Sequence, residues 1–266
     1  MKKKVIVFTA IMGNYNKLRE IKNPDKNIKY ICFTDQKIKS NTWQIVKGST
    51  IFYNSNLNAK IHKVLPHIYF NCDYSLWIDA SIEIYGNILN LIDSHIDEKT
   101  DLVLFKHTKR DCPYCEANLV ISSKIVNKNK VRSQMNKYHK NGLPLHKGLS
   151  QGNVLLRKHS KKMESFNLKW WVEICRYTQR DQLSLDYCIN KMNFGHKYFN
   201  LPSLYENNGY FRYYGHKKNI SHILVLLRIA IAERNLFDFS KILIKLKNSF
   251  RQKIIGIFAI ESTGIS

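Results

Sequence analysis

The fold is decided by the stretch Asp73-Tyr74-Ser75-Leu76-Trp77-Ile78-Asp79-Ala80-Ser81-Ile82-Glu83-Ile84. Its short apolar run from Leu76 to Ile78 is typical of a strand buried on both faces. Asp79 follows at the carboxyl end of that run, where a buried carboxylate is costly unless a cation meets it. Ligands of open α/β sheets bind outside the carboxyl ends of the strands. The stretch therefore predicts a binding crevice beside Asp79.

Asp79 and Ser81 are spaced one residue apart, so an extended backbone points both side chains the same way. Hard oxygen ligands of this kind suit Mg²⁺ or Mn²⁺ that carries a diphosphate. A strand-ending Asp-x-Ser turn explains the same tripeptide. From the tripeptide alone, the metal site and the turn both remain open.

Three apolar runs around this stretch predict further strands, at Lys4–Ala10, Lys29–Asp35 and Trp43–Val46. An acid at the end of the second strand, Asp35, is well placed for a ribose or a base. The turn after the first strand has one glycine and no Gly-x-Gly-x-x-Gly motif, which argues against a dinucleotide site. Tyr15 in that turn is suited to stacking on a base or to packing in the core.

A helix is predicted over Asn58–Phe70, with a kink or restart at Pro66. Lys60 and Lys63 lie three residues apart and thus on one helix face. They form either a pair of cations aimed at a diphosphate or a solvated surface.

The rest of the chain alternates between helical and strand patterns. The expected elements are a helix over Gly86–His95, a strand over Asp101–Phe105, a basic surface helix over Lys124–Lys140, a turn and strand over Gly148–Arg157, a helix opened by Trp170-Trp171 and a helix starting at Gln179–Tyr187. Asp181 would lie at the start of the last helix, where a plain N-cap is the alternative to a functional carboxylate.

Composition bounds the protein class. The 266 residues suffice for one large α/β domain, or one domain with a small appendage, and 44% are hydrophobic. A net charge of +23 implies anionic partners: nucleotide phosphates, nucleic acid or an acidic membrane. The basic residues are spread along the chain without a helix-turn-helix, RNP or zinc-finger pattern, which argues against nucleic acid.

The six cysteines include one CxxC pair, Cys112-Pro113-Tyr114-Cys115. A zinc site needs two more ligands, and no second pair at matching spacing is present. A redox pair is typical of a helix start in a smaller fold. We therefore expect reduced cysteines in a cytosolic protein. We also expect neither a signal peptide nor a membrane span, which needs an apolar run of about 20 residues.

The tail over Ile220–Ile260 is rich in Ile, Leu and Phe. It has one apolar stripe at helical spacing, formed by Phe239, Ile242, Leu243, Leu246, Phe250 and Ile254. Lysines and arginines fall mostly outside the stripe, although Lys253 intrudes on it. A basic amphipathic helix of this kind lies in an anionic membrane interface. Docking on the catalytic domain or on a second subunit, as in a homodimer, is the alternative.

The order of these elements resembles the GT-A nucleotide-sugar glycosyltransferases, especially the glycogenin-like and lipooligosaccharide galactosyltransferase group. More closely, it resembles a glycosyltransferase-like domain, formerly of unknown function, shared by bacterial polysaccharide proteins and plant proteins linked to pectic mucilage. The segments that carry the resemblance are Thr9–Tyr15, Phe33–Asp35, Asn58–Pro66, Leu76–Ser81, His107–Glu116, Gly148–Arg157 and Arg180–Tyr187. The resemblance implies a GT-A-like single Rossmann-type α/β domain with a mostly parallel sheet over residues 1–216, followed by a helical basic tail over 217–266.

The resemblance also implies roles for particular residues. Nucleotide and donor contacts fall on Thr9, Ala10, Tyr15, Asp35, Lys60, Lys63, Asp79 and Ser81. Sugar and acceptor contacts fall on His107, Arg110, Glu116, Gly152 and Asn153, and catalytic roles fall on Asp181 and Gln182. Mn²⁺ or Mg²⁺ would be held by Asp79, Ser81 and His216, the last in a loop that is similar to a late His-x-x-Gly-x-x-Lys loop of the family. The family's Asp-x-Asp motif is Asp79-Ala80-Ser81 here, without the second carboxylate.

The expected function is therefore transfer of a sugar from a nucleotide sugar, a UDP-sugar by preference, to a glycan or glycolipid acceptor of the cell surface such as lipopolysaccharide or capsule. The glycogenin-like resemblance slightly favours retention. The expected location is cytoplasmic, on the inner face of the plasma membrane. The alternatives are a nucleic-acid-binding protein and a lipid-amide hydrolase, although the chain has no Gly-x-Ser-x-Gly elbow and no dense His/Asp cluster.

Overall fold

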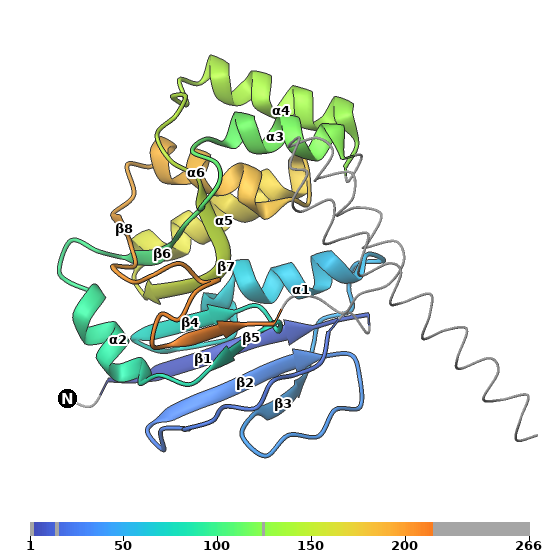
Figure 1. The fold of residues 1–266 in the computed structure, drawn as a ribbon. Coiled ribbons are helices and arrows are strands. Elements are labelled where there is room, and N and C mark those ends of the chain that lie inside the picture. The colour runs from blue at the N-terminus through green and yellow to red at the C-terminus, as the bar shows by residue number, and fades with distance from the viewer. Residues whose placement is uncertain (1–2, 14–15, 124–125, 215–266) are drawn as a thin grey trace, which may run out of the picture.

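A seven-stranded sheet forms the centre of the computed structural model, which describes residues 3–13, 16–123 and 126–214 (Figure 1). Its order is β3-β2-β1-β4-β7-β6-β8. The strands are β1 (Val5–Ile11), β2 (Ile28–Thr34), β3 (Gln44–Lys47), β4 (Tyr74–Ile78), β6 (Leu102–Lys106), β7 (Ser150–Lys158) and β8 (His196–Tyr198). Within this sheet β7 alone runs against the other strands. The prediction of an α/β domain with a mostly parallel central sheet is confirmed.

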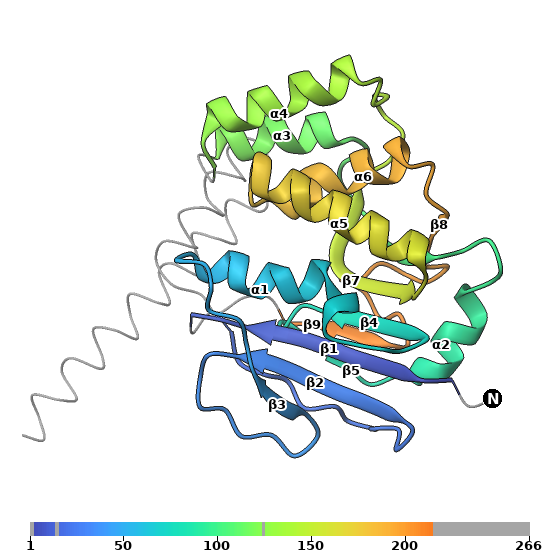
Figure 2. The same cartoon turned by 180° about the vertical axis from the view of Figure 1, so that it is seen from behind.

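Helices cover the sheet on both faces. They are α1 (Ser55–Val64), the 3-10 turn η1 (Pro66–Ile68), α2 (Ile88–His95), α3 (Pro113–Ser122), α4 (Lys128–Lys140), α5 (Lys161–Arg176) and α6 (Asp181–Lys191). Figures 1 and 2 show α1 and α3 to α6 stacked on one side of the sheet. The other face packs against α2 and a small antiparallel pair, β5 (Ile82–Ile84) with β9 (Phe211–Tyr213). Of the described helices, none has the length and apolar character needed to cross a membrane.

Alternation along the strands divides the interior into two cores. In β1, Ile6 and Phe8 join the core beneath α1 and α5, whereas Val5 and Val7 join the core on the opposite face. Because successive strand residues point to opposite faces, a strand with a core on each side must be apolar at nearly every position. This is why the apolar runs in the sequence identified β1, β2 and β4 correctly.

The stretch around Asp79 contains both a crevice residue and a turn. Leu76, Trp77 and Ile78 are buried in β4, as predicted. The main-chain N–H of Asp79 donates to the carbonyl of Asn153 in β7 (2.9 Å), and the N–H of Ile82 donates back to the carbonyl of Asp79 (2.9 Å). The chain thus reverses after Asp79 and enters β5, while Asp79 stays at the carboxyl end of β4.

The predicted interruption at Pro66 is confirmed, since α1 ends at Val64 and the 3-10 turn begins at the proline. The start of α1 is held by the side chain of Asn54, which accepts the N–H of Asn56 (2.8 Å). Farther along, the His62 ring stacks on Phe33 at a centroid distance of 4.0 Å. The first contact fixes the start of the helix, and the second packs the helix against β2.

One helix prediction needs correction, and one helix was not predicted. Trp170 does not open a helix: α5 begins at Lys161, where the Ser160 side chain accepts the N–H of Met163 (3.1 Å), and Trp170 is buried farther along it. The aromatic pair marks the buried face, whereas the serine gives the start signal. The sequence pattern also missed α3, which begins with Cys112 as its N-cap and Pro113 in the first turn.

Candidate active site

Two adjoining cavities lie at the carboxyl ends of β1 and β4. The larger, of about 420 Å³, is lined by the end of β1, by α1 and by the start of α6. The smaller, of about 280 Å³, is lined by the loop after β6, by the start of β7 and by two tyrosines, Tyr205 and Tyr213. Both cavities share Lys63, Asp79 and Arg180-Asp181. These shared residues form the junction at which two ligands would meet.

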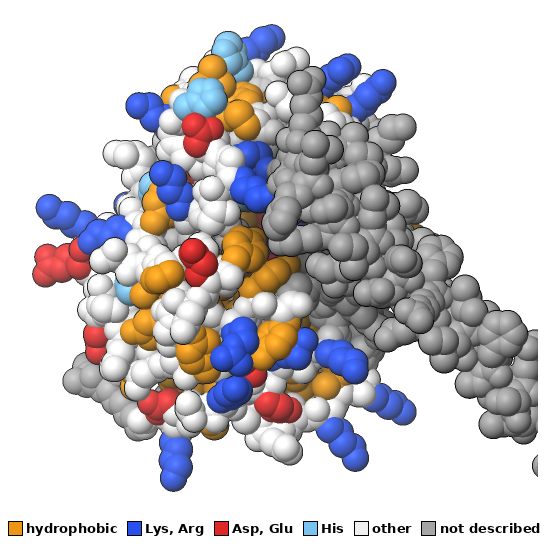
Figure 3. Space-filling view, viewed as in Figure 1, with side chains coloured by type: hydrophobic (Ala, Val, Ile, Leu, Met, Phe, Trp, Pro, Cys, Tyr) orange, Lys and Arg blue, Asp and Glu red, His pale blue; other side chains and the backbone are white. Residues whose placement is uncertain are grey.

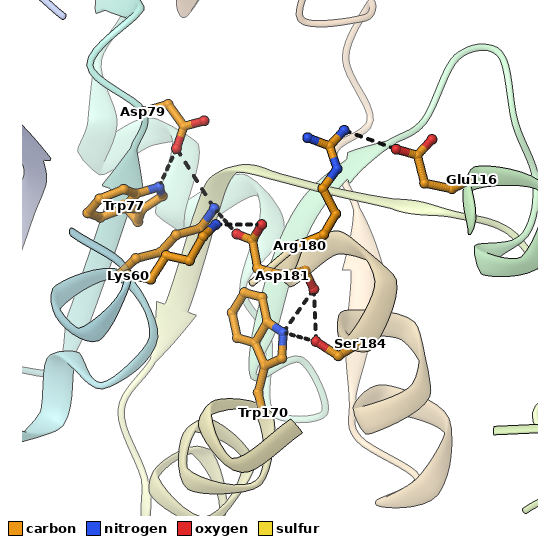
Figure 4. A network of polar contacts seen from close by, with 9 residues as sticks. Lys60, Trp77, Asp79, Glu116, Trp170, Arg180, Asp181 and Ser184 are labelled. Carbon is orange, nitrogen blue, oxygen red and sulfur yellow. Dashed lines mark hydrogen bonds and ion pairs between the residues drawn. The ribbon is translucent and has the colours of Figure 1, made fainter. Parts of the chain in front are cut away.

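The junction is a cluster of opposite charges (Figure 4). The Asp181 carboxylate contacts the Lys60 ammonium at 2.8 Å and the Lys63 ammonium at 2.6 Å. Lys63 also lies 3.8 Å from a carboxylate oxygen of Asp79. Lys60 and Lys63, which the sequence placed on one helix face, therefore point together into the site.

Asp181 is not an N-cap. Arg180 occupies the cap position of α6 and makes no side-chain capping bond, whereas the Asp181 carboxylate turns to the lysines. The Asp181 carbonyl accepts the indole N–H of Trp170 and the hydroxyl of Ser184, each at 3.1 Å. Although burial raises the pKa of the Asp181 carboxyl, the two lysines outweigh burial and hold that pKa far below its usual range. Asp181 is therefore ionised at neutral pH.

Asp79 lies on the other side of Lys63. One of its carboxylate oxygens accepts the indole N–H of Trp77 at 2.9 Å, and the Lys63 ammonium lies 5.7 Å from the centre of the Trp77 ring. About a third of the Asp79 side chain, 32%, is exposed. Trp77 thus orients a carboxylate that still faces the cavity.

A second polar network forms the wall of the smaller cavity. Glu116 is 1% exposed and accepts from Arg110 (2.7 Å) and Arg180 (3.0 Å). Burial raises the pKa of the Glu116 carboxyl, but the two arginines outweigh it and hold the pKa below its ordinary value. A guanidinium nitrogen of Arg110 also lies 3.1 Å from the His107 ring. These groups present hydrogen-bonding atoms of fixed position.

The start of β7 reaches the cavity through an irregular register. Pairing with β6 passes from Leu104–Leu155 directly to Phe105–Gln151, so residues 152–154 bulge out of that ladder. Such bulges re-aim side chains next to active sites. Gly152 and Asn153 consequently line the smaller cavity together with Gln182, whose amide N–H donates to the carbonyl of Ser150 (3.2 Å).

The structure brings together most of the predicted site residues that it describes. Ala10, Lys60, Lys63 and Asp79 line the larger cavity, and all five predicted acceptor residues line the smaller one, namely His107, Arg110, Glu116, Gly152 and Asn153. Asp181 lines both cavities and Gln182 lines the smaller.

Three predicted residues lie beside the cavities without lining them. Thr9 is fully buried. Asp35 accepts the N–H of Gly13 with both carboxylate oxygens (3.0 and 3.2 Å), so it shapes the turn after β1. Ser81 is 2% exposed, and its hydroxyl has no hydrogen-bond partner within the part of the chain that the structure describes. Tyr15, His216 and the tail over 217–266 lie outside the described residues.

Sequence reasoning did not assign roles to several residues that the structure places here. Arg180 lines both cavities, Trp77 and Trp170 orient the two aspartates, and Tyr205 and Tyr213 line the smaller cavity. The position of Trp77 two residues before Asp79 was a usable signal, because an extended backbone points both side chains the same way. The tyrosines follow the last strand of the sheet and carry no local pattern.

Comparisons with known proteins identify the family of this chain. The chain is 23% identical over 217 residues to the "Probable hexosyltransferase MUCI70" of Arabidopsis thaliana, covering 71% of this chain and 37% of that protein. It is 25% identical over 225 residues to the "Alkaline ceramidase TOD1" of the same plant, covering 71% of this chain and 49% of that protein. The chain thus spans less than half the length of these relatives. The model of one domain family matches residues 1–216, which confirms the resemblance found in the sequence: the chain belongs to the TOD1/MUCI70 glycosyltransferase-like domain family.

Proposed function

We propose that this chain is a glycosyltransferase that moves a hexose from a UDP-sugar to a glycan acceptor. The observation that carries the proposal is the junction of the two cavities, where Lys60 and Lys63 meet Asp79 and Asp181. Sugar transfer needs cations for the departing diphosphate and a carboxylate near the anomeric carbon. The larger cavity would hold the nucleotide sugar and the smaller one the acceptor.

The lysines are suited to the diphosphate. Both ammonium groups reach the larger cavity from α1, and both already contact a carboxylate that can release them to phosphate oxygens. A negative charge that grows on the leaving diphosphate would be stabilised by these fixed cations. Thr9, Ala10, Tyr15 and Asp35 are proposed to shape or contact the nucleoside part.

The described residues alone do not form a three-ligand magnesium or manganese site here. Asp79 offers a carboxylate to the cavity, Ser81 does not line the cavity, and His216 lies outside the described residues. Mg²⁺ commonly binds through one or two carboxylates plus substrate phosphates. We therefore propose that Mn²⁺ or Mg²⁺, when it accompanies the diphosphate, is held through Asp79. Such an ion would supply further positive charge to the leaving group.

Asp181 is proposed to act by its charge. A good general base has a pKa near the working pH, whereas the lysines hold the pKa of Asp181 far below it. An ionised carboxylate at the junction is instead suited to stabilising positive charge at the anomeric carbon. Such charge develops in both retaining and inverting transfer, but inverting transfer also needs a base for the acceptor hydroxyl, so the low pKa of Asp181 favours the retaining reaction. Gln182 would orient the sugar beside it.

The acceptor cavity is polar. Its wall combines the His107–Arg110–Glu116 network with Gln151, Asn153 and the two tyrosines. Alternating donors and acceptors with flanking aromatic rings suit sugar hydroxyl groups and sugar faces. We propose a cell-surface glycan such as lipopolysaccharide or capsule as the acceptor.

We further propose that the enzyme acts in the cytoplasm, at the inner face of the plasma membrane. The basis is the basic amphipathic pattern of residues 220–260, which lie outside the described part of the chain. On the face in Figure 3, Lys and Arg side chains are spread among acidic and apolar ones rather than gathered into one patch. This distribution supports local phosphate sites more than a continuous nucleic-acid groove.

The test combines binding and turnover. Wild-type protein is screened against a panel of UDP-sugars, and a donor at about 100 times its Kd should stabilise the fold by about 2.7 kcal/mol. Transfer or slow hydrolysis of that donor is then measured. Asp79→Ala and Lys63→Met should abolish turnover, whereas the exposed controls Asp93→Ala and Lys161→Met should retain it. Hydrolysis of ceramide, the activity in the name of one relative, is measured in parallel.

Two outcomes would overturn the proposal. One is near wild-type turnover by Asp79→Ala with every donor that shifts the melting temperature. The other is ceramide hydrolysis by wild-type protein that binds no nucleotide sugar.

A further inference from the structure

Four side chains that can bind metal gather outside both cavities. Asp111, Cys112, Cys115 and His146 each offer one ligand atom, and all four atoms lie within 4.8 Å of one another. The two sulfurs are 2.9 Å apart, and the His146 Nδ1 lies 2.9 Å from each Asp111 oxygen. Among the residues that the structure describes, this is the one such group of three or more His, Cys, Asp or Glu side chains.

We propose that these four residues form a structural zinc site. Thiolate, imidazole and carboxylate are the ligands that zinc takes, and structural sites are closed by four protein ligands in a tetrahedron. Zn–S bonds of about 2.3 Å would separate the sulfurs by about 3.8 Å, which side-chain rotation of the half-buried Cys115 can supply. A disulfide would use two of the four groups and give no role to His146 or Asp111.

The backbone is built to bring these groups together. Cys112 caps α3 and Cys115 lies one turn later, so both sulfurs face the same side of the helix start. His146 comes from a distant loop and has a φ of 53°, a left-handed conformation that is uncommon for residues other than glycine. Next to it, the N–H of Gly148 donates to the Asp111 carbonyl (2.6 Å). The unusual conformation of His146 directs its ring at the CxxC turn.

The site would join the two loops that form the acceptor wall. One loop carries His107 and Arg110 and ends at Cys112, and the other leads from His146 into Ser150 and the start of β7. The N–H of His107 already donates to the Leu149 carbonyl (2.7 Å). Because the four ligands line neither cavity, the zinc would stabilise the acceptor side without taking part in the reaction.

The test measures metal directly and needs no knowledge of the substrate. Full-length protein is purified with a phosphine reductant, and its zinc content is determined by elemental mass spectrometry. We expect one zinc per chain. Replacement by Co²⁺ should give a thiolate-to-cobalt charge-transfer band, and a strong zinc chelator should lower the melting temperature.

Variants distinguish loss of the metal site from a general loss of structure. Cys115→Ser should weaken zinc binding by at least about tenfold, the lower end of what the loss of an outer-shell partner alone costs. His146→Asn should do the same while keeping the backbone, because asparagine tolerates positive φ. Cys175→Ser is the matched control, since Cys175 is an exposed free cysteine far along α5. It should keep full zinc content.

The proposal would be overturned if reduced wild-type protein took up neither zinc nor cobalt. It would also be overturned if His146→Asn bound zinc as tightly as wild type. Because zinc content is read without any sugar donor, this outcome is independent of whether the proposed transferase activity is correct.

Discussion

Replacing Asp181 by asparagine tests the central ion cluster. The side chains of Asp181, Lys63 and Lys60 are 12%, 7% and 20% exposed, so one carboxylate forms ion pairs with two largely buried ammonium groups. Asparagine keeps the shape but turns one oxygen into an amide donor that faces a cation. Breaking a buried pair from one side costs about 3–5 kcal/mol.

The expected loss lies at the lower end of that range. Burial and the neighbouring Lys63 lower the pKa of Lys60, and Asp181 is the main group that raises it again. Without Asp181, Lys60 can shed its proton and escape part of the penalty. We therefore expect a loss of about 3 kcal/mol, equivalent to a melting temperature lower by about 6–12 °C in a protein of this size.

UDP binding and turnover should respond differently to this substitution. Both lysines are released from Asp181, and a bound diphosphate supplies the negative charge that returns the proton to Lys60, so the affinity for UDP should stay the same or increase. Turnover should fall by about 100-fold or more, the cost of removing one preorganised electrostatic contact to a transition state. UDP should also stabilise Asp181→Asn at least as strongly as it stabilises wild type.

The assays are thermal unfolding with and without UDP, calorimetric UDP binding, and turnover at saturating donor. Asp93→Asn is the matched control, because Asp93 is exposed on α2 and should change stability by less than about 0.5 kcal/mol. The double variant Lys60→Met/Asp181→Asn should regain part of the lost stability, since one buried cation is removed. Unchanged stability of Asp181→Asn, or equal losses in UDP affinity and turnover, would refute this role of the carboxylate.

Three further predictions concern metal, pH and the tail. Mn²⁺ or Mg²⁺ should stimulate transfer, and full activity in EDTA would instead mean that the lysines neutralise the diphosphate alone. Burial lowers the pKa of both His62 and His159 from 6.5 to about 4, so the unfolded chain takes up these protons first. As the pH is lowered from 6.5 to about 4, the unfolding free energy should then fall by up to about 1.4 kcal/mol per pH unit for each histidine. His62→Asn should reduce this dependence on pH, measured by urea unfolding at a series of pH values. An unaltered pH dependence would contradict the prediction. Full-length protein should co-sediment with anionic liposomes, less so as salt is raised, whereas a chain ending at Lys218 should not; equal sedimentation of both would assign the tail to protein packing instead.

The strands were predictable because each must fill two cores at once. That requirement leaves an unbroken apolar run in β1, β2 and β4, which local pattern analysis detects. The antiparallel direction of β7 was not predictable from its own residues, since an apolar run predicts a buried strand but not the direction of that strand in the sheet. The start of α5 was missed because the cap residue Ser160 is a weaker sequence signal than the apolar pair Trp170-Trp171, which lies inside the helix.

The lining of the larger cavity was predictable where strand position or helical spacing marks a residue. Asp79 and the Lys60–Lys63 pair stand out by strand position and helical spacing, and they do line the larger cavity. The partnership of Asp181 with both lysines was not predictable, because 118 residues separate Lys63 from Asp181. The same limit applies to His146, which joins the CxxC pair only through the fold.

Gly152 shows how closely the sheet approaches this cluster from the side opposite α1. A Cβ at this position would lie 3.1 Å from the Lys63 ammonium and 3.5 Å from an Asp181 oxygen. The ammonium is the flexible end of its side chain and could give way, so alanine would cost the fold little but would displace the cation that lies between the two aspartates. Glycine at the bulge of β7 therefore leaves Lys63 free to contact Asp181 and Asp79 at once. In the proposed reaction, a diphosphate that draws the lysines toward itself would leave the Asp181 carboxylate to face the sugar at the junction of the two cavities.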